Sequence, residues 1–397
     1  MKLLYISNSR IPTTKAHGHQ IFKMCQIFAK HQVAVELICP SRKNPEFKNT
    51  DAFAYYHIPK IFKLKKICSY DPQWLIKFPA GAYIKFQALF FIVSLFIYLL
   101  SKKNRAEYIF YTRDEYLLPI LQLFSRRVVW EGHSLPKRKK YYQKYFIKCH
   151  RILVLTNELK KMLIALGVKK NKILVSPDAV ELEIFGIHLD KNKAREQLNL
   201  PQDKILLSYT GTFKTKNMDK GLEDILLALK IINKNNILFI AVGGSLEHIQ
   251  EYQELAEKLN IKNIKLMPKV SQQQLAIYQQ ACDILLMPFP WTEHYAYFMS
   301  PLKMFENMAS GRPIIATDLP AIKEVLNQNN AFLVKPDDPQ DLARGIGRLI
   351  QDQQLSITLA NQSLKDIQQY TWQARVEKII KFILTEGGIE KNYQENI

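Results

Sequence analysis

The sequence predicts an α/β protein with two doubly wound, parallel β-sheets. Short runs of continuously apolar residues recur along the chain, and each is followed by a stretch with helical periodicity. Continuous apolarity, as opposed to alternation, is typical of strands buried on both faces of a parallel sheet. The runs form two series, and a charged stretch around residues 178–203, bounded by Pro177 and containing Pro201, separates them. Strands separated by helices imply right-handed crossovers, so we expect two domains joined by a hinge.

Twelve strands are predicted, six in each series. The first series covers residues 3–6, 33–39, 108–111, 128–130, 152–155 and 172–176. The second series covers residues 204–210, 237–242, 263–267, 283–287, 313–316 and 331–334. Ligands of such sheets bind outside the carboxyl ends of the strands. Two domains facing one another would therefore hold a ligand in an interdomain cleft.

Charge is distributed unevenly along the chain. Up to residue 175 there are 32 basic and 9 acidic residues, a net charge of +23, whereas the remainder has 24 basic and 27 acidic residues. A cationic field concentrates anions. We therefore expect the N-terminal half to face a membrane surface, nucleic acid or a polyanionic substrate.

The cysteines and the N-terminus point to a reduced, cytoplasmic protein. Five cysteines are scattered without a CxxC pair, which fits neither a disulfide framework nor a zinc site. The first ten residues, MKLLYISNSR, become polar after one strand's length, so no signal peptide is expected.

One segment, from Ala82 to Leu100, is mostly apolar but contains Lys85, Gln87 and Ser94. Its cleanest part, residues 88–100, would be about 20 Å long as a helix, whereas a bilayer core is about 30 Å thick. We expect a buried or interfacial helix in preference to a membrane span.

The stretch 298–318, FMSPLKMFENMASGRPIIATD, carries the strongest signals for a binding site. Ser300 is predicted as the N-cap of a helix with Pro301 at its first position, and Gly311 as its stop. A helix N-terminus at a cleft can bind phosphate, and Glu306 could accept hydrogen bonds from ribose hydroxyls. The alternative is an ordinary capped surface helix with an exposed glutamate.

Several segments, in this order and spacing, resemble GT-B glycosyltransferases of the family-4, or group 1, type. Residues 300–326 are similar to the donor-site segment of that family, and residues 209–229, YTGTFKTKNMDKGLEDILLAL, to its phosphate-binding loop. Further similar segments are 15–32, 128–134, 172–185, 241–244, 281–289 and 371–383. The resemblance implies two Rossmann-like domains facing across a cleft. Residues 1–180 would form the acceptor-side domain, 181–370 the nucleotide-sugar domain, and 371–397 a helix packing back toward the first.

The resemblance also implies a donor site. Lys220 would contact the donor diphosphate, since an ammonium is a compact charge suited to a phosphate oxygen; the alternative is a solvated lysine before a helix. The family often has arginine after the first glycine of the loop, where this chain has Thr212. Lys214 or Lys216 could replace it, and we favour Lys214. The predicted donor-binding residues are Gly18, Gly211, Lys214, Lys220, Gly243, Ser300, Leu302, Lys303 and Glu306.

Two features depart from the family pattern. Of its paired glutamates, E-x7-E, Glu306 matches the second, whereas Phe298 stands at the first, which normally contacts the transferred sugar. Glu293 and His294 are the neighbouring candidates to replace it. Asp178-Ala179 stands where Asn-Gly is usual. The SPLK variant resembles a branch of the family, so loss of activity need not follow.

His133, at the end of the strand in VVWEGHS, matches the family's active-site histidine, although a lone histidine is more often structural. Its place at a strand's carboxyl end favours contact with the sugar. Gly18, between His17 and His19, would let backbone approach the donor phosphates or the acceptor. There is no D-x-D pair, so no metal is expected, and no cofactor beyond the nucleotide-sugar substrate.

The resemblance therefore predicts a retaining, metal-independent glycosyltransferase with a lipid-linked or cell-surface glycan acceptor. Two alternatives are a sugar-nucleotide epimerase of related fold and a degenerate, non-catalytic binder of anions or nucleic acid. No nucleic-acid motif accompanies the charge, so nucleic acid is not expected.

Basic residues interleaved with aromatic residues predict attachment to the inner face of an anionic membrane. Lys137, Arg138, Lys139 and Lys140 precede several aromatic residues, and a second cluster lies at residues 60–67. The alternative is a solvated charge run.

Overall fold

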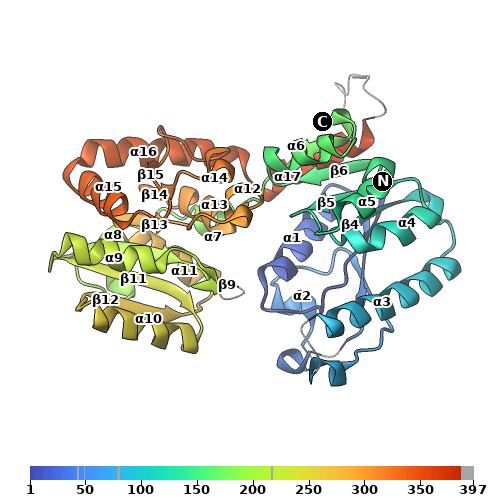
Figure 1. Cartoon of the computed structure of the whole chain (residues 1–397), viewed down its shortest axis with the longest axis horizontal. Coiled ribbons are helices and arrows are strands. Elements are labelled where there is room, and N and C mark those ends of the chain that lie inside the picture. Colours follow the sequence, from blue (N-terminus) through green and yellow to red (C-terminus); the bar gives the residue numbers. More distant parts are fainter. Residues whose placement is uncertain (43, 49, 78–80, 216–217, 386–397) are drawn as a thin grey trace. The chain divides into compact units, whose positions relative to one another are not determined.

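The chain forms two compact units, each built on one parallel β-sheet (Figure 1). The computed structural model describes residues 1–385, apart from residues 43, 49, 78–80 and 216–217. The first unit comprises Met1–Ser176 and the chain from Trp372 onward, and the second comprises Pro177–Thr371.

The first sheet has seven parallel strands in the order β3-β2-β1-β4-β5-β6-β7. They are β1 (Lys2–Ile6), β2 (Ala34–Pro40), β3 (Lys63–Ile67), β4 (Tyr108–Thr112), β5 (Val128–Gly132), β6 (Arg151–Val154) and β7 (Ile173–Val175). Tyr5 in β1 stands in register with Leu37 and Tyr111, and all three are fully buried. The winding direction reverses between β1 and β4, the switch point where doubly wound sheets bind ligands.

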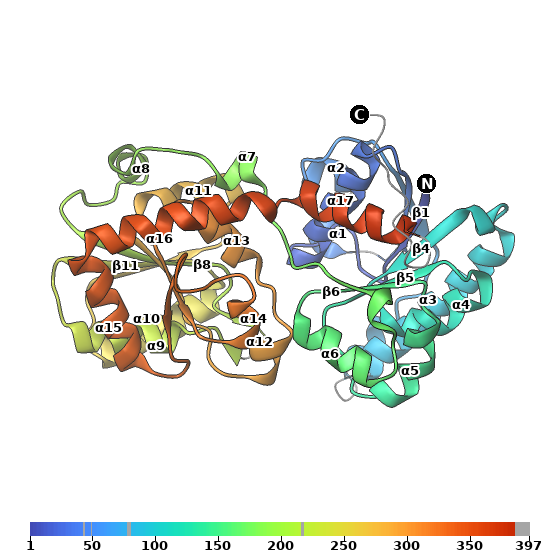
Figure 2. The ribbon, with the colours of Figure 1, turned by 90° about the horizontal axis from the view of Figure 1, so that it is seen from above.

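The described residues of the first unit form seven α-helices. They are α1 (Ala16–Lys30), α2 (Ala52–Tyr55), α3 (Ala82–Ser101), α4 (Leu118–Phe124), α5 (Lys139–Lys148), α6 (Asn157–Ala165) and α17 (Trp372–Leu384). The last of these comes from the C-terminus and packs against α1 (Figure 2). Arg151 at the start of β6 donates a hydrogen bond to the carbonyl oxygen of Phe382 at 2.9 Å. The final helix thus completes the first unit.

The edge strand β3 was not predicted, because its sequence KLKKI reads as a basic surface segment. Lys63, Lys65 and Lys66 are exposed, and only Ile67 of the strand is fully buried. β3 pairs with β2 alone. Lysines on an edge strand oppose pairing with another chain, so charge at this position is compatible with strand structure.

The second sheet has six parallel strands in the order β12-β11-β8-β13-β14-β15. They are β8 (Ile205–Thr210), β11 (Ile237–Gly244), β12 (Ile264–Pro268), β13 (Ile284–Met287), β14 (Ile314–Thr317) and β15 (Phe332–Val334), with a separate hairpin of β9 (Lys214–Thr215) and β10 (Met218–Asp219). Leu207 and Tyr209 of β8 pack against residues from the helical segments 222–232, 246–258 and 339–351. Leu206, on the opposite face of the sheet, packs against residues from the helical segments 191–197 and 272–281. Burial on both faces explains the continuous apolar runs.

Ten α-helices lie within the part of the second unit that the structure describes. They are α7 (Leu182–Phe185), α8 (Lys191–Gln197), α9 (Leu222–Ile232), α10 (Leu246–Lys258), α11 (Gln272–Ala281), α12 (Glu293–Tyr297), α13 (Leu302–Ala309), α14 (Pro320–Lys323), α15 (Pro339–Gln351) and α16 (Gln353–Asp366). One face of the sheet carries α9, α10 and α15, and the other carries α8, α11 and α13.

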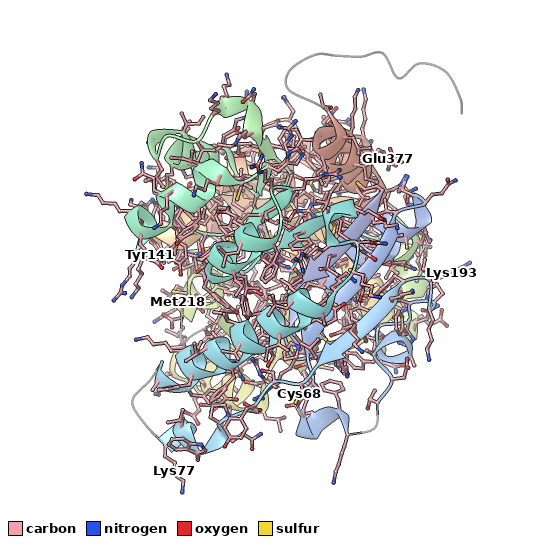
Figure 3. The ribbon with its side chains drawn as sticks, turned by 90° about the vertical axis from the view of Figure 1, so that its right-hand side faces the viewer. Cys68, Lys77, Tyr141, Lys193, Met218 and Glu377 are labelled. Atoms are coloured by element: carbon pink, nitrogen blue, oxygen red, sulfur yellow. The ribbon has the colours of Figure 1, made fainter. Side chains whose placement is uncertain are left out.

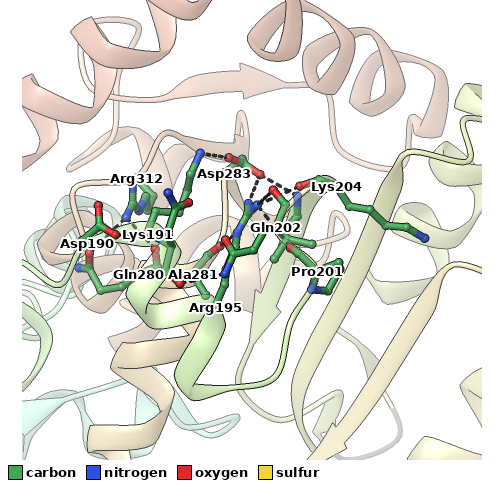
Figure 4. Close-up of polar contacts among 12 residues, drawn as sticks. Asp190, Lys191, Arg195, Pro201, Gln202, Lys204, Gln280, Ala281, Asp283 and Arg312 are labelled. Carbon is green, nitrogen blue, oxygen red and sulfur yellow. Dashed lines mark hydrogen bonds and ion pairs between the residues drawn. The ribbon is translucent and has the colours of Figure 1, made fainter.

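A buried arginine anchors α8 to the amino ends of the central strands (Figure 4). Arg195 donates to Asp283 at 2.6 Å and to the carbonyl oxygens of Ala281, Gln202 and Lys204 at 2.9–3.1 Å. The same carboxylate oxygen of Asp283 accepts from the backbone N–H of Leu206 at 2.7 Å, at the start of β8. The buried charge is therefore neutralised and hydrogen-bonded, as burial of an ion requires.

The predicted fold class is confirmed, since both units are doubly wound parallel sheets. All twelve predicted strands are present in the two sheets. In both sheets the second strand along the chain lies beside the first, and the fourth lies on the first strand's other side, which is the Rossmann arrangement.

Candidate active site

Two glycines let the loops of the second unit pack closely at the carboxyl edge of its sheet. Gly243, at the end of β11, has φ +124°, and a Cβ there would lie 2.5 Å from the carbonyl oxygen of Gly211. Gly221, which precedes α9, has φ +95°, and a Cβ there would overlap the carbonyl oxygen of Pro288 after β13. Both positions combine a left-handed backbone with backbone contact, so only glycine fits. The loops after β8, β10, β11 and β13 meet here.

Lys303, in the first turn of α13, is a buried cation at this edge. Its Nζ lies 3.5 Å from the ring centroid of Tyr209 and 5.1 Å from that of Phe289. The Nζ atom is inaccessible to solvent and has no hydrogen-bond acceptor among the described residues. Burial lowers the pKa of Lys303 well below its usual range, and the charge of Lys220 lowers it further. An ammonium in such a place lacks the anion that would normally accompany it.

Lys220 lies in the adjacent loop, between β10 and α9. Its Nζ donates a hydrogen bond to the Thr212 hydroxyl at 2.7 Å, and burial lowers its pKa to about 8. Asp219 holds the loop, because its carboxylate accepts from the backbone N–H of Gly221 and from the hydroxyl of Tyr252. Lys220 is thus held in place before any ligand binds.

Glu306 lies one helical turn beyond Lys303 on α13 and is half-buried. Burial raises the pKa of its carboxyl to about 7, and the charge of Lys303 opposes that shift. Its side chain forms no hydrogen bond within the described part of the chain. A carboxyl in this state can accept hydrogen bonds from hydroxyl groups, which would favour its ionised form.

The predicted capping role of Ser300 is corrected by the structure. α13 begins at Leu302, Pro301 is the N-cap, and no side chain caps the helix. Instead, the Ser300 hydroxyl accepts a hydrogen bond from the backbone N–H of Asp178 at 2.9 Å. Leu302 is half-buried at the first position of the helix. Ser300 therefore links the start of α13 to the segment that contains Asp178. Asp178 stands at the position where the family usually has asparagine.

Lys214 lies on β9 and is engaged elsewhere. Its ammonium forms an ion pair with Glu251, and Nζ lies 5.4 Å from the ring centroid of Tyr252. Lys216, the other lysine considered in this loop, lies outside the described residues. The structure thus places Lys303, and not Lys214, over Gly211: a Cβ at Gly211 would be 3.2 Å from Lys303 Cε.

Phe298 occupies the position where the family has its first glutamate. The side chain is half-buried after α12, and its ring centroid lies 6.4 Å from that of His294 and 6.5 Å from that of Tyr297. Glu293 and His294 are exposed on α12. An aromatic side chain, with two further rings near it, therefore occupies the position where the family has a carboxylate.

In the first unit, His133 follows β5 with both ring nitrogens engaged. Nε2 lies 2.9 Å from Glu131 Oε1, and Nδ1 lies 3.0 Å from Arg113 Nη2. Arginine only donates, so Nδ1 must accept and Nε2 must carry the proton donated to Glu131. Burial and the charge of Arg113 lower the pKa of His133 to about 4. The imidazole is therefore neutral near pH 7 and has no free nitrogen to act as a base.

Glu131, which sequence reasoning did not single out, is the centre of this cluster. It is buried, and Arg375 of α17 donates to its Oε1 at 2.8 Å while the hydroxyl of Tyr111 donates to Oε2. Burial alone would raise the pKa of Glu131, but the charge of Arg375 holds it well below its usual range. Tyr111 and Arg375 lie far from Glu131 in the sequence, so no local motif indicated that they would meet it.

Arg113 is a second residue that sequence reasoning missed. It directly follows β4, donates to Gln20 at 2.5 Å as well as to His133, and is half-buried. Its charge also lowers the pKa of His17, for which burial is the larger cause, to about 4. Its place immediately after a strand's carboxyl end was the available signal.

Gly18 lies in the first turn of α1, where a Cβ would overlap the Tyr56 hydroxyl and the Thr13 side chain. The Tyr56 hydroxyl accepts from the backbone N–H of Thr13 at 2.9 Å. The absence of a side chain at Gly18 is thus accounted for by packing. His19, half-buried on the same helix, has its ring centroid 6.2 Å from that of Tyr56.

No group of three or more histidine, cysteine, aspartate or glutamate side chains within the described ranges could hold a metal ion. The polar groups gathered at the second sheet are instead two lysines and a glutamate.

Residues 190–366 match the family model of glycosyl transferases group 1. The second unit is a group 1 glycosyltransferase domain. The match begins just before α8 and ends in α16, so it contains the whole second sheet and the lysines described above.

Curated proteins similar to the chain include other glycosyltransferases. A D-inositol 3-phosphate glycosyltransferase of Nocardioides sp. is 25% identical over 231 residues, covering 54% of this chain and 49% of that protein. The one from Streptomyces avermitilis is 26% identical over 216 residues, covering 51% and 45%. An uncharacterised protein in the cps region of Klebsiella pneumoniae is 24% identical, covering 58% and 63%. The chain spans about half the length of the inositol phosphate glycosyltransferases.

Solved structures match the group 1 domain together with the first unit. Sucrose-phosphate synthase from Thermosynechococcus elongatus has a TM-score of 0.75 at 17% identity, covering 96% of this chain and 97% of that one. A glycosyltransferase from Rickettsia africae has a TM-score of 0.74 at 15% identity, covering 97% and 99%. HepE of Anabaena, solved with UDP-glucose, has a TM-score of 0.68 at 17% identity, covering 96% and 98%. These likenesses show the GT-B fold.

Proposed function

We propose that the chain is a glycosyltransferase whose nucleotide-sugar donor binds at the carboxyl edge of the second sheet. The observation that carries this proposal is the buried, unaccompanied ammonium of Lys303 beside Lys220. Two cations held together in a desolvated site require an anion, and a donor diphosphate supplies one. The group 1 domain and the names of its relatives support the same function.

Lys303 takes the place of the arginine that the family often has after Gly211. Its stem runs over Gly211, and its ammonium rests against Tyr209, whereas the Lys214 ammonium is paired with Glu251. Lys303 and Lys220 together then bind the donor diphosphate. The free backbone N–H groups at the start of α13, and the positive end of the helix dipole there, also favour binding of an anion.

Glu306 binds the ribose of the donor in this proposal. Its half-buried carboxyl is one turn along α13 from the phosphate-binding lysine and has a pKa raised to about 7. Hydrogen bonds donated by two ribose hydroxyls would stabilise the ionised carboxylate and lower that pKa.

The reaction needs stabilisation of a leaving group more than it needs a protein base. The bond between the sugar C1 and the phosphate oxygen breaks, negative charge develops on the diphosphate, and fixed cations stabilise it. The acceptor hydroxyl attacks from the same face, its oxygen bonds to C1, and its proton passes to the departing phosphate. The configuration at C1 is then retained without a metal ion. His133, whose two ring nitrogens are engaged by Glu131 and Arg113, takes no proton in this reaction.

The donor and acceptor are proposed from the relatives. HepE binds UDP-glucose, so UDP-sugars are the first donors to test. The Klebsiella relative is named for a cps region, which supports a lipid-linked or cell-surface glycan as acceptor. Synthesis at the cytoplasmic face of a membrane would bring enzyme and acceptor together.

Nucleotide release from UDP-, GDP- and ADP-sugars, measured with and without a lipid-linked glycan and with and without EDTA, tests the proposal. We expect release from one nucleotide class, dependent on acceptor and unaffected by EDTA. Conversion of the nucleotide sugar without nucleotide release would instead identify an epimerase. Nucleotide binding without turnover of any donor would identify a non-catalytic binder.

A further inference from the structure

Helix α3 of the first unit carries its apolar residues on the outside. It is long and apolar enough to cross a membrane, by length and composition alone. Its exposed side chains include Phe86, Leu89, Val93, Phe96, Ile97 and Leu100. At about 100° per residue these six lie on one stripe of the helix. Figure 3 shows α3 crossing the front of the view with no other element in front of it.

The opposite stripe of α3 packs on the unit through apolar and polar contacts. Phe91, Leu95 and Leu99 are fully buried. Tyr83 donates to Asp71 at 2.6 Å, near the start of the helix, and Tyr98 donates to Glu36 at 2.6 Å, near its end. A surface helix of a soluble protein normally has the reverse pattern, with polar residues outward.

These polar anchors exclude a transmembrane orientation of α3. Glu36 also accepts from Lys102 at 2.7 Å, and Arg42 donates to the carbonyl oxygen of Gln87 at 2.8 Å. Withdrawal of the helix into lipid would leave these partners buried without hydrogen bonds. The helix can contact a bilayer only while these hydrogen bonds to the first unit are kept.

The apolar stripe continues onto neighbouring elements. α3 contacts α4, on which Leu123 is 75% exposed, and the Phe96 ring lies 5.4 Å from that of Phe124. Tyr70, whose ring lies 5.0 Å from that of Phe90, is also exposed. Exposed apolar surface of this extent marks an interaction site and is not ordinary scatter.

Exposed cations lie on α3 and on the segments next to it, and they favour an anionic partner. Lys77 and Lys85 lie near the start of α3, Lys103 follows its end, and Arg126 and Arg127 follow α4. The edge strand β3, which also contacts α3, adds further exposed lysines. A second copy of the chain would bring two such cationic surfaces together, which repel. An anionic bilayer offers acyl chains to the stripe and phosphates to the lysines.

We propose that α3 lies in the plane of an anionic membrane, with residues 86, 89, 93, 96, 97 and 100 inserted at the boundary of headgroups and acyl chains. The flanking lysines and arginines contact lipid phosphates. This inference rests on the first unit alone and does not depend on the proposed donor site.

Flotation with lipid vesicles tests the proposal. The protein should float with vesicles of equal parts phosphatidylcholine and phosphatidylglycerol, stay behind with phosphatidylcholine alone, and lose binding as salt rises. Replacement of Leu89, Val93 and Ile97 by glutamine should reduce vesicle binding by about tenfold or more. Leu246→Gln, at an 81% exposed leucine of the second unit, is the matched control and should leave binding unchanged. Unchanged binding of the triple variant would overturn the proposal.

A depth probe gives a second measurement that needs no destabilising change. Cys68 is the one exposed cysteine, since the other four are buried, so an Ile97→Cys, Cys68→Ser variant can be labelled at one position with a polarity-sensitive dye. Dye emission should shift to the blue on anionic vesicles, whereas the same dye on Leu246→Cys in the Cys68→Ser background should not respond. A dye at residue 97 that stays in water while the protein floats would overturn the proposal.

Two other outcomes would assign the surface differently. Light scattering should show a monomer without lipid; a dimer that the triple variant disperses would make a second copy the occupant of the stripe. A second variant replaces residues 137–140 by glutamine. If this variant loses vesicle binding and the triple variant does not, the basic cluster at residues 137–140 is the membrane site. Equal melting temperatures of the variants and the parent protein would exclude unfolding as the cause.

Discussion

The ammonium of Lys303 lies 3.5 Å above the ring of Tyr209, with its Nζ buried and without a hydrogen-bond acceptor among the described residues. A cation–π contact offsets part of the desolvation cost but does not replace a counter-anion. We therefore expect Lys303 to destabilise the second unit in the absence of ligand, and a bound anion to offset that cost.

Lys303→Met should raise stability and lower turnover at the same time. Methionine has a similar shape and no charge to desolvate, so we expect a higher melting temperature without ligand. Turnover should fall by about 10²-fold, because leaving-group charge loses one of its cations in the transition state. Thermal melting and nucleotide release measure the two effects. Lys258→Met, at an exposed lysine of α10, should change neither. A variant that is less stable yet active would contradict the assignment.

Donor binding should release protons at low pH and take them up at high pH. At pH 6 the Glu306 carboxyl, with a pKa of about 7, is largely protonated, and ribose hydroxyls favour its ionised form. At pH 9 Lys220, with a pKa of about 8, is largely neutral, and a diphosphate favours its charged form. Calorimetry of UDP-glucose binding in buffers of different ionisation enthalpy measures both.

The variants separate the two groups. Glu306→Gln should remove the contribution of Glu306 to proton release at pH 6 and leave the uptake at pH 9. Lys220→Met should reduce the uptake at pH 9 and leave the part that comes from Lys303, whose pKa is also lowered by burial. Binding with no proton exchange at either pH would show that neither side chain contacts the donor.

The apolar pattern was sufficient to predict the fold, whereas the polar contacts of the site were not predictable from it. Parallel strands buried on both faces leave a continuous apolar run, so β8 and β11 were evident; β3 was not, since its edge position permits lysines. The neutral state of His133 depends on burial and on the charge of Arg113, against the opposing effect of Glu131, and the sheet brings these residues together from different strands. Lys303 could be named from its motif, but its lack of a partner is a property of packing around Tyr209.

Glu131→Gln should destabilise the first unit by about 3–5 kcal/mol, because the buried guanidinium of Arg375 would lose its carboxylate counter-ion. The pKa of Glu131 is below its unfolded value, so its stabilising contribution is present at neutral pH and is lost as pH falls through the lower, folded-state pKa. Denaturant unfolding from about pH 5 down to about pH 2 should show a smaller pH dependence for Glu131→Gln than for the parent. Glu377→Gln, at an exposed carboxylate of α17, is the matched control and should cost little. Equal stability of the two variants would show that Arg375 is solvated.

Gly221→Ala should weaken donor binding through the position of Lys220. The backbone at Gly221 has φ +95°, and an added Cβ would overlap the carbonyl oxygen of Pro288, so the loop must move away from β13. Lys220, the preceding residue, would move with it and lose its place beside Thr212 and Lys303. We expect the dissociation constant for UDP-glucose to rise by about tenfold or more, with a loss of at least about 1 kcal/mol in stability from the strained backbone.

Gly347→Ala is the matched control, because Gly347 lies in α15 with no atom within 4 Å of the added Cβ. It should gain up to about 1 kcal/mol from helix propensity and bind the donor normally. Normal donor affinity in Gly221→Ala would show that this loop does not hold the diphosphate.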